Sequence, residues 1–279
     1  MSERWEVDLS ILVPVKDEVE NIPLLAGEIA EALADTALSW ECLWVDDGSI
    51  DGSLDALEAL RAGDRRHRYL SLDRNYGQSA ALMAGLREVR APVVGTLDAD
   101  LQNDPRDIPR LLEVLEGGSA EMVSGVRVRR RDRRIRRVAS KIANAFRNLV
   151  TGEQVTDVGC SIRVFRTRCA QGLPSFRGMH RFIPTLVRLR GVEVAEVAVG
   201  HRPRRHGRTK YGIHDRLWVG IADTLGVRWL KARWVEPRIG TRGTGVPVEA
   251  RRVVLPRSRN GADPMPIRGG PADRRVERP

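Results

Sequence analysis

The chain has 279 residues, 42% of them hydrophobic, and a formal net charge of +10 that arginine supplies almost alone. This composition allows one large domain or two small ones with a real core, and its basic balance favours polyanionic partners such as nucleic acid, anionic lipid or a phosphorylated substrate. It disfavours a secreted or membrane-spanning protein, because the N-terminus has no apolar leader, the three cysteines form no even set and no run of about 18 apolar residues occurs.

The first half of the chain alternates strand and helix patterns. Short apolar runs of this kind are typical of buried strands. They lie at 9–15, 40–45, 69–72, 93–97 and 121–126. The alternation predicts an α/β fold with a mainly parallel sheet and helices on both faces.

Helical spacing of apolar residues separates these strands. Helices are predicted to begin near Asn21, Ser53, Ser79 and Pro109. In the first of them Asn21 is expected to cap the helix. Its buried face is expected to carry Leu24, Leu25, Ile29 and Leu33.

The second half is more basic. Eight arginines fall within 127–137, and a helix over 135–150 and strands at 161–165 and 192–199 are predicted beyond. A last helix, 213–234, is predicted to be amphipathic. Its apolar residues near one face are Leu217, Trp218, Ile221, Leu225, Trp229 and Leu230.

Periodicity stops at Pro237, and we predict a disordered tail rich in Arg, Pro and Gly. The chain is thus expected to comprise a catalytic domain at 1–212, an interfacial helix at 213–236 and the basic tail at 237–279.

Acidic residues follow three of the predicted strands. Glu18 lies just after the first, Asp46 ends the second, and Asp98 and Asp100 follow the fourth. In open α/β sheets ligands bind at the carboxyl ends of the strands, and carboxylates are the ligands that Mg²⁺ and Mn²⁺ prefer. These residues therefore indicate a cation site that would offset the charge of a diphosphate.

Two common phosphate-binding classes do not fit. A dinucleotide oxidoreductase needs G-x-G-x-x-G after the first strand, where this chain has Pro14-Val15-Lys16-Asp17-Glu18. A Walker A loop is absent as well. Phosphate is therefore expected to be held by a metal and by cationic side chains, of which a dense group occurs at 201–211.

Seven short motifs occur in a fixed order: V-P-V-K-D-E, D-D-G-S, D-R-N-Y-G-Q, D-A-D-L-Q-N-D-P, D-V-G-C, H-R-F-I-P and H-R-P-R-R-H-G-R-T-K-Y. Together they resemble the family 2 glycosyltransferases that act on polyprenyl phosphates, including dolichol-phosphate-mannose synthases and bacterial undecaprenyl-phosphate aminoarabinose and glucose transferases. The resemblance covers roughly 9–234. It implies a GT-A fold, a nucleoside-diphosphate sugar donor and a polyprenyl phosphate acceptor, for cell-envelope glycan or lipid modification.

The resemblance also implies roles for individual residues. Pro14, Glu18 and Asp46 would line the nucleoside pocket, while Asp98, Asp100 and Gln102 would surround the metal, Mg²⁺ or Mn²⁺, and the diphosphate. The acceptor half would include Asp157 and Arg181. The residues that would reach phosphates are Arg202, Arg204 and Lys210.

The expected reaction is an inverting sugar transfer. A phosphate monoester is largely dianionic near neutral pH, so its oxygen attacks without a strong general base. The protein's tasks are then positioning and charge stabilisation. Because the acceptor lies in a bilayer, we expect peripheral attachment to the inner face of the cytoplasmic membrane through 213–234, which carries tryptophans and basic residues.

Three alternatives remain open at this point. A nucleic-acid-binding protein would explain the basic charge but not the acids at the strand ends. A family 2 transferase acting on a soluble or glycan acceptor would share the catalytic half, although the Q-x-x-R-W motif of polymerising members is absent. A catalytically silent scaffold would not need Asp98, Asp100 and Gln102 intact.

Overall fold

A sheet organises the described part of the chain, which in this computed structural model comprises residues 5–128, 144–153, 155–203 and 213–235. Its strands are β1 (Leu9–Val15), β2 (Trp40–Asp46), β3 (His67–Ser71), β4 (Val93–Thr96), β5 (Met122–Arg127), β6 (Arg163–Arg166) and β7 (Val194–Val199). They lie in the order β3-β2-β1-β4-β6-β5-β7.

The sheet is mainly parallel, as predicted, and only β6 among these strands runs antiparallel, between β4 and β5. The carboxyl ends of the parallel strands therefore share one edge. Because β6 runs the other way, its first residue, Arg163, also lies toward that edge.

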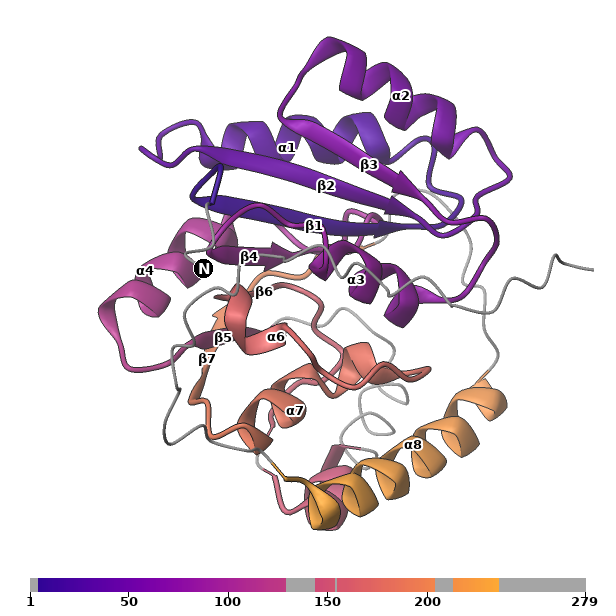
Figure 1. Ribbon diagram of the computed structural model, residues 1–279, viewed down its shortest axis with the longest axis vertical. Helices are drawn as coiled ribbons and strands as arrows, with labels where there is room; N and C mark the ends of the chain where they lie inside the picture. The colour runs from indigo at the N-terminus through magenta and orange to yellow at the C-terminus, as the bar shows by residue number, and fades with distance from the viewer. Residues whose placement is uncertain (1–4, 129–143, 154, 204–212, 236–279) are drawn as a thin grey trace, which may run out of the picture. The chain divides into compact units, whose positions relative to one another are not determined.

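Helices cover both faces (Figure 1). One core cluster lies under α1 (Ile22–Leu33), α2 (Ser53–Gly63) and α4 (Asp107–Gly117). The other lies under α3 (Gln78–Leu86), α6 (Thr167–Ala170) and α7 (Ile183–Leu189), together with the short helix η1 (Met179–Arg181). Neither face of the central strands is left to solvent, which explains why their sequences read as continuous apolar runs.

The start of α1 differs from the prediction. Asn21 has helical backbone angles, and its side chain donates to Glu18 at 2.6 Å instead of capping the helix. Leu24 is 42% exposed, whereas Leu25, Ile29 and Leu33 are buried. Leu24 lies one position before Leu25, and neighbouring residues of a helix point about 100° apart, so it falls outside the buried stripe.

The last helix, α8 (Ile213–Arg233), packs onto the second core through part of its length. Val227 is 1% exposed, and the amino group of Lys231 donates to the carbonyl oxygen of Thr151 at 2.9 Å. Leu225 and Trp229 of the predicted apolar stripe are 52% and 64% exposed, so the stripe does not face the core at these two positions. The side chains of Leu217 and Trp218 lie outside the described residues, and no described helix is long and apolar enough to cross a bilayer.

The chain divides into two compact units, Met1–Glu236 and Pro237–Pro279. All described residues belong to the first unit, so the predicted tail lies outside them. The same holds for most of the arginine-rich stretch 127–137 and for the first part of the helix predicted at 135–150, of which 144–151 is helical.

Candidate functional site

The acidic segments predicted from the sequence meet at the carboxyl edge of the sheet. Val15 at the end of β1 is paired with Asp46 at the end of β2, and the amide of Asp47 donates to the carbonyl oxygen of Val15 at 2.8 Å. On the other side of β1, the amide of Leu97 donates to the carbonyl oxygen of Leu12 at 3.2 Å. The loops after β1, β2 and β4 are therefore neighbours, as parallel strands require.

Asp98 and Asp100 lie on the loop that follows β4. Asp100 is 7% exposed, and its carboxylate accepts the amide N–H of Gln102 at 3.2 Å. Burial, and then the neighbouring charge of Asp100, raises the pKa of Asp98 to about 6. Leu101 is fully buried with a left-handed φ of 59°, which is rare for a bulky residue. The loop thus holds two carboxylates close together at an energetic cost that a cation would offset.

The N-terminus of α3 supports this loop. The side-chain amide of Gln78 donates to Asp98 at 2.7 Å. Asp47 accepts the backbone N–H groups of Tyr76 and Gly77 at 2.7 and 2.8 Å, and so fixes the entry into the helix. The role of Gln78 was missed from the sequence, although its motif, D-R-N-Y-G-Q, lies between a strand and a helix where ligand-binding turns occur.

Ser79 links α3 to the second half of the chain. Its hydroxyl lies 2.9 Å from Nδ1 of His180 and accepts the amide N–H of Gly178 at 3.1 Å. Burial, with further contributions from Arg181 and Arg163, lowers the pKa of His180 to about 3. His180 is therefore neutral near pH 7, and this contact too was not foreseen from the sequence.

The three residues predicted to line a nucleoside pocket lie near one another on the ends of β1 and β2. Asp46 is 1% exposed, and its carboxylate accepts the amide of Ser49 at 3.1 Å and the hydroxyl of Ser71 at 3.2 Å. Pro14 is half-buried within β1, and Glu18 follows that strand. Asp46 thus also organises the turn after β2, and the nucleoside role of the three residues stays a prediction.

Gln102 and Arg202 are brought together although 100 positions separate them. The amide of Arg202 donates to the carbonyl oxygen of Gln102 at 2.8 Å. The Arg202 guanidinium forms ion pairs with Glu28 at 2.7 Å and Asp104 at 2.5 Å. Its charge is balanced by two carboxylates in this structure, so its present contacts hold the loop rather than a phosphate. Arg204 and Lys210 lie outside the described residues.

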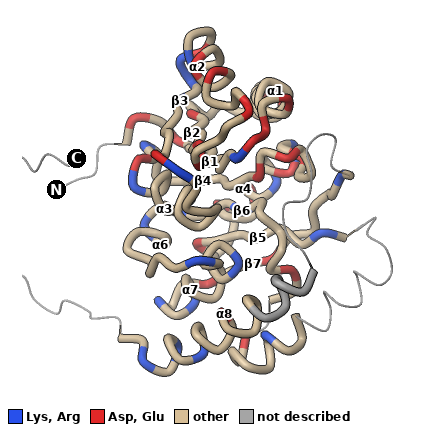
Figure 2. Tube along the Cα trace, turned by 90° about the vertical axis from the view of Figure 1, so that its right-hand side faces the viewer, with Lys and Arg blue, Asp and Glu red and all other residues tan. Residues whose placement is uncertain are grey.

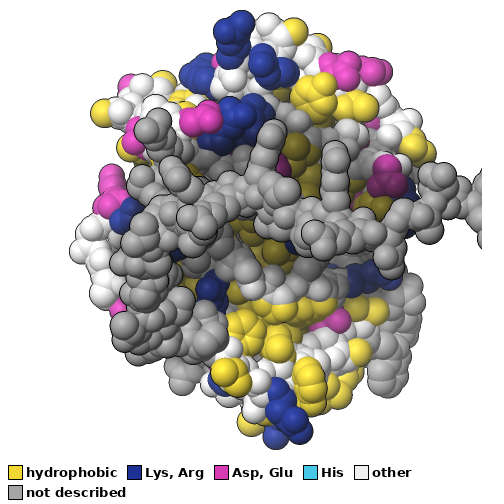
Figure 3. Space-filling model, in the orientation of Figure 1, with side chains coloured by type: hydrophobic (Ala, Val, Ile, Leu, Met, Phe, Trp, Pro, Cys, Tyr) yellow, Lys and Arg dark blue, Asp and Glu magenta, His cyan; other side chains and the backbone are white. Residues whose placement is uncertain are grey.

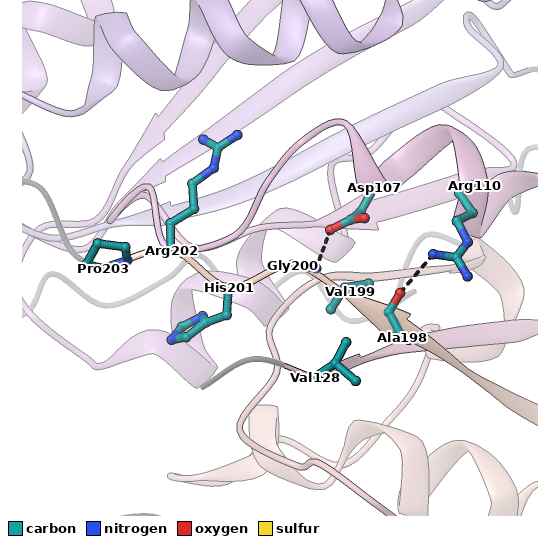
Figure 4. Close-up of a pocket in the computed structure, with 9 residues that line it drawn as sticks. All are labelled: Asp107, Arg110, Val128, Ala198, Val199, Gly200, His201, Arg202 and Pro203. Atoms are coloured by element: carbon teal, nitrogen blue, oxygen red, sulfur yellow. Dashed lines mark hydrogen bonds between the residues drawn. The ribbon is translucent and has the colours of Figure 1, made fainter. Parts of the chain in front are cut away.

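A pocket of about 520 Å³ lies beside this segment, against α4 and the ends of β5 and β7. Asp107 accepts the amide of Gly200 at 2.9 Å, and Arg110 donates to the carbonyl oxygen of Ala198 at 3.2 Å. Figure 4 shows Arg202 and His201 pointing in different directions from the same stretch. The lining residues are Asp107, Arg110, Val128, Ala198, Val199, Gly200, His201, Arg202 and Pro203.

The predicted acceptor half contains a close ion pair. Arg127 at the end of β5 donates two hydrogen bonds to the carboxylate of Asp157, at 2.6 and 2.8 Å. Arg181 ends η1, directly after His180. Asp157 and Arg181 therefore lie on segments at the second half of the sheet, and Asp157 is held in one orientation by its partner.

The carboxylates fit a hard divalent cation, although within the described residues no group of three or more His, Cys, Asp and Glu side chains could hold a metal. Mg²⁺ is commonly bound by one or two carboxylates while waters and substrate phosphates complete its shell. Asp98 and Asp100 supply two such ligands, and the side-chain nitrogen of Gln102 points to the carbonyl oxygen of Arg202 at 3.5 Å, leaving its amide oxygen as a further donor atom. The donor set suits a cation shared with a bound diphosphate.

The chain is similar in sequence to proteins of a known family. Residues 10–172 match the model of the family described as glycosyl transferase family 2. A dodecaprenyl-phosphate galacturonate synthase from Rhizobium johnstonii is 34% identical over 255 residues, which cover 89% of this chain and 75% of that protein. An undecaprenyl-phosphate 4-deoxy-4-formamido-L-arabinose transferase from Pseudomonas fluorescens is 40% identical over 73% of this chain, which spans 60% of that protein's length.

Solved structures share the fold. Glucosyl-3-phosphoglycerate synthase from Mycobacterium tuberculosis, in complex with Mn²⁺, UDP and glucosyl-3-phosphoglycerate, has a TM-score of 0.60 at 21% identity and covers 81% of this chain and 79% of that one. A mannosyltransferase from Pyrobaculum calidifontis, in complex with GDP-mannose and Mn²⁺, has a TM-score of 0.56 at 17% identity and covers 85% and 70% of the two chains. At these identities the likeness concerns the fold alone.

Proposed function

The chain belongs to glycosyl transferase family 2, and from that premise we propose that it transfers one sugar from a nucleoside-diphosphate sugar to a polyprenyl phosphate. The observation that carries the proposal is the extent of the similarity to polyprenyl-phosphate sugar transferases. It reaches 89% of the chain, well beyond the family match that ends at residue 172. The similarity therefore includes the second half of the chain, in which we place the acceptor.

The donor would bind at the edge formed by the loops after β1, β2 and β4. Pro14, Glu18 and Asp46 would line the nucleoside pocket. Asp98, Asp100 and Gln102 would hold Mg²⁺ or Mn²⁺, which when bound neutralises charge on the departing diphosphate. The burial of Asp100 and the raised pKa of the neighbouring Asp98 support this assignment.

The acceptor phosphate would approach from the side of β5, β6 and η1. Its second pKa is near 6, so it is largely dianionic near neutral pH, and the protein need not supply a strong base. Asp157, held by Arg127, and Arg181 would position it, while Arg202, Arg204 and Lys210 would shape and charge the loop after β7. Direct displacement at the anomeric carbon would invert its configuration.

We also propose that α8 contacts the membrane surface as a peripheral anchor on the cytoplasmic side. Leu225 and Trp229 are 52% and 64% exposed. Basic residues lie along the helix and in its last turn (Figure 2). Figure 3 shows hydrophobic and basic side chains gathered on the lower part of one face, where α7 and α8 lie. Exposed tryptophan beside cationic residues suits the interfacial zone of an anionic bilayer.

The proposal is tested by incubating the full chain with a panel of uridine and guanosine diphosphate sugars, undecaprenyl phosphate and Mg²⁺ or Mn²⁺. The lipid fraction is then read by mass spectrometry. We expect a sugar-bearing lipid with at least one donor and none after chelation of the metal. If every donor leaves the lipid unchanged while a water-soluble acceptor is glycosylated, the alternative of a family 2 transferase with a soluble or glycan acceptor replaces the proposal.

A further inference from the structure

Two arginines are buried beside the proposed acceptor half of the site. Arg163 opens β6 and is 3% exposed, and Arg147 lies in the helical segment 144–151 and is 4% exposed. Arg163 is paired across the sheet with Thr96, the last residue of β4, and with Ser124 of β5. Arginine is almost never buried so fully unless its charge is met.

Both guanidinium groups retain N–H donors that have no acceptor among the residues that the structure describes. Nη2 of Arg163 makes a long contact of 3.5 Å with the carbonyl oxygen of Val158, and its Nε has no partner in the described part of the chain. Nη2 of Arg147 donates to the side chains of Asn144 and Asn148 at 2.7 and 3.2 Å. Its Nε and Nη1 have no acceptor within the described residues. Unmet donors in a buried cation destabilise the folded chain, so their retention calls for a ligand that meets them.

The carboxylates nearest Arg163 are engaged elsewhere. Asp157 receives two hydrogen bonds from Arg127, and Asp98 receives one from Gln78. Both carboxylates act on Arg163 electrostatically, but among the described residues Arg163 donates to neither. Its charge therefore remains only partly compensated.

The charge of Arg147 is likewise only partly compensated. Of the carboxylates that act on it besides Asp157, Glu153 is bound by Lys231 at 2.7 Å and by Arg188 at 3.4 Å. Glu196 accepts the amide N–H of Thr156 at 2.9 Å. Arg147 and Arg163 also repel each other. The acids that act on the two buried arginines are thus each engaged by another donor, and among the described residues neither arginine forms a direct ion pair with them.

We propose that Arg163, with Arg147 behind it, forms a buried cationic floor that binds a phosphate monoester at the acceptor side of the site. The inference rests on the proposed function for the identity of that monoester as the lipid acceptor's phosphate. The neighbours of Arg163 place it on the acceptor side of the site. It interacts electrostatically with Asp157 and Cys160, which share one loop, and with His180. A dianionic phosphate offers several acceptor oxygens to guanidinium donors.

This role makes an unusual prediction for stability. If Arg163 were only structural, its replacement would destabilise the chain. A buried, poorly compensated charge is instead expected to be replaceable by methionine, a side chain of similar length, at little or no cost in the absence of ligand. The same replacement should remove the stabilisation that a bound phosphate provides, since a ligand stabilises only the state that binds it.

The test measures the thermal unfolding midpoint of the full chain with and without inorganic phosphate, and again with a short, water-soluble prenyl phosphate. Arg163→Met and Arg147→Met are compared with Arg188→Met, which removes a partly buried arginine that is paired with Glu153. We expect both ligands to raise the midpoint of the wild type and of Arg188→Met. We expect Arg163→Met to unfold at or above the wild-type midpoint without ligand and to respond much less to either, with Arg147→Met intermediate.

Steady-state kinetics supply the second readout. In Arg163→Met the KM for the prenyl phosphate should rise about 10- to 100-fold, the loss typical of hydrogen bonds to a charged group. The KM for the donor should change less than about threefold. Arg163→Lys, which keeps the charge, should recover part of the loss.

The inference is overturned if Arg163→Met keeps the wild-type response to phosphate, or if donor and acceptor KM rise together. A wild type that transfers no sugar to prenyl phosphate yet is stabilised by phosphate through Arg163 would contradict the proposed function and leave the anion site standing. Sugar transfer to prenyl phosphate that is unchanged by Arg163→Met would support the proposed function and contradict the anion site.

Discussion

The two halves of the site use charge in opposite ways. Around β1, β2 and β4 the buried charged groups are acids, and several of them accept backbone N–H groups and so build the turns, as Asp46 and Asp47 do. Around β5 and β6 two arginines are buried, Arg147 and Arg163, and both keep N–H donors that no described residue accepts. In the proposed function the acid-rich edge would bind a cation and through it a diphosphate, whereas the guanidinium donors would bind phosphate directly. On this account one site would bind several phosphates because each half would bind them by a different chemistry.

The largest expected effect comes from breaking the acidic half. Asp100→Ala should lower turnover about 10³-fold or more, because the cation that stabilises the leaving group would be lost. The thermal unfolding midpoint should be unchanged or slightly raised, since the repulsion between Asp98 and Asp100 is relieved. Turnover with Mg²⁺ or Mn²⁺ is measured beside the exposed control Asp35→Ala, and full activity of Asp100→Ala in chelator would contradict the assignment.

The basic loop after β7 provides the next comparison. Arg204→Ala and Lys210→Ala should each reduce kcat/KM about 10- to 100-fold if they reach phosphates. Arg251→Ala, in the tail, should leave it nearly unchanged. Arg202→Ala is expected to lower the unfolding midpoint as well, because it breaks ion pairs with Glu28 and Asp104. Equal, small effects of all four changes on activity would show that none of these side chains binds a phosphate.

Gln78 joins α3 to the acidic half. Two substitutions separate the loss of its hydrogen bond to Asp98 from the introduction of a negative charge. Gln78→Leu should lower turnover about tenfold, since Asp98 loses a hydrogen bond to a charged acceptor. Gln78→Glu should cost more, because a carboxylate would then face Asp98. If Gln78→Glu is the more active of the two in a turnover assay, the account of this contact is wrong.

A pH-dependent stability is expected from His180. Its folded pKa, about 3, is below that of the unfolded chain, so the stability it contributes is present above about pH 6.5 and is lost as the pH falls toward 3. The loss should approach about 1.4 kcal/mol per pH unit. Urea unfolding at about pH 7 and pH 5 should show a smaller acid-induced loss for His180→Gln than for the wild type, and parallel losses would exclude this origin.

The smallest expected effect concerns the membrane surface. Leu225→Ala with Trp229→Ala should reduce co-sedimentation with anionic vesicles about tenfold, because both side chains are more than half exposed. Circular dichroism should stay unchanged for the same reason. Val227→Ala is the contrasting variant, since that side chain is buried and its loss should lower the unfolding midpoint. Vesicle binding that ignores the double change would assign the contact to another surface.

Local patterns predicted the elements of the first half well. The apolar run at Leu9–Val15 and the start of α2 at Ser53 agree with the structure, because parallel strands buried on both faces leave a strong one-dimensional signal. The antiparallel placement of β6 was not predictable, since its four residues carry no sign of direction.

Candidate residues could be predicted where they lie in short sequence motifs. They could not be predicted where their role depends on partners distant in the sequence. Asp98 and Asp100 stood out because they follow a strand. The pairing of Arg202 with Glu28 joins residues 174 positions apart, and the burial of Arg163 depends on strands from three parts of the chain. No local pattern distinguishes an arginine that a carboxylate already holds from one whose donors are unmet.

The mass of the lipid product tests the central claim most directly. After reaction with a nucleoside-diphosphate sugar, undecaprenyl phosphate should gain the mass of one sugar residue and no additional phosphate, because an acceptor phosphate bound over the arginine half attacks the anomeric carbon of a donor held by the acidic half. A product that has gained a sugar together with a second phosphate, or lipid that stays unchanged while a soluble acceptor gains the sugar, would contradict this division of the site.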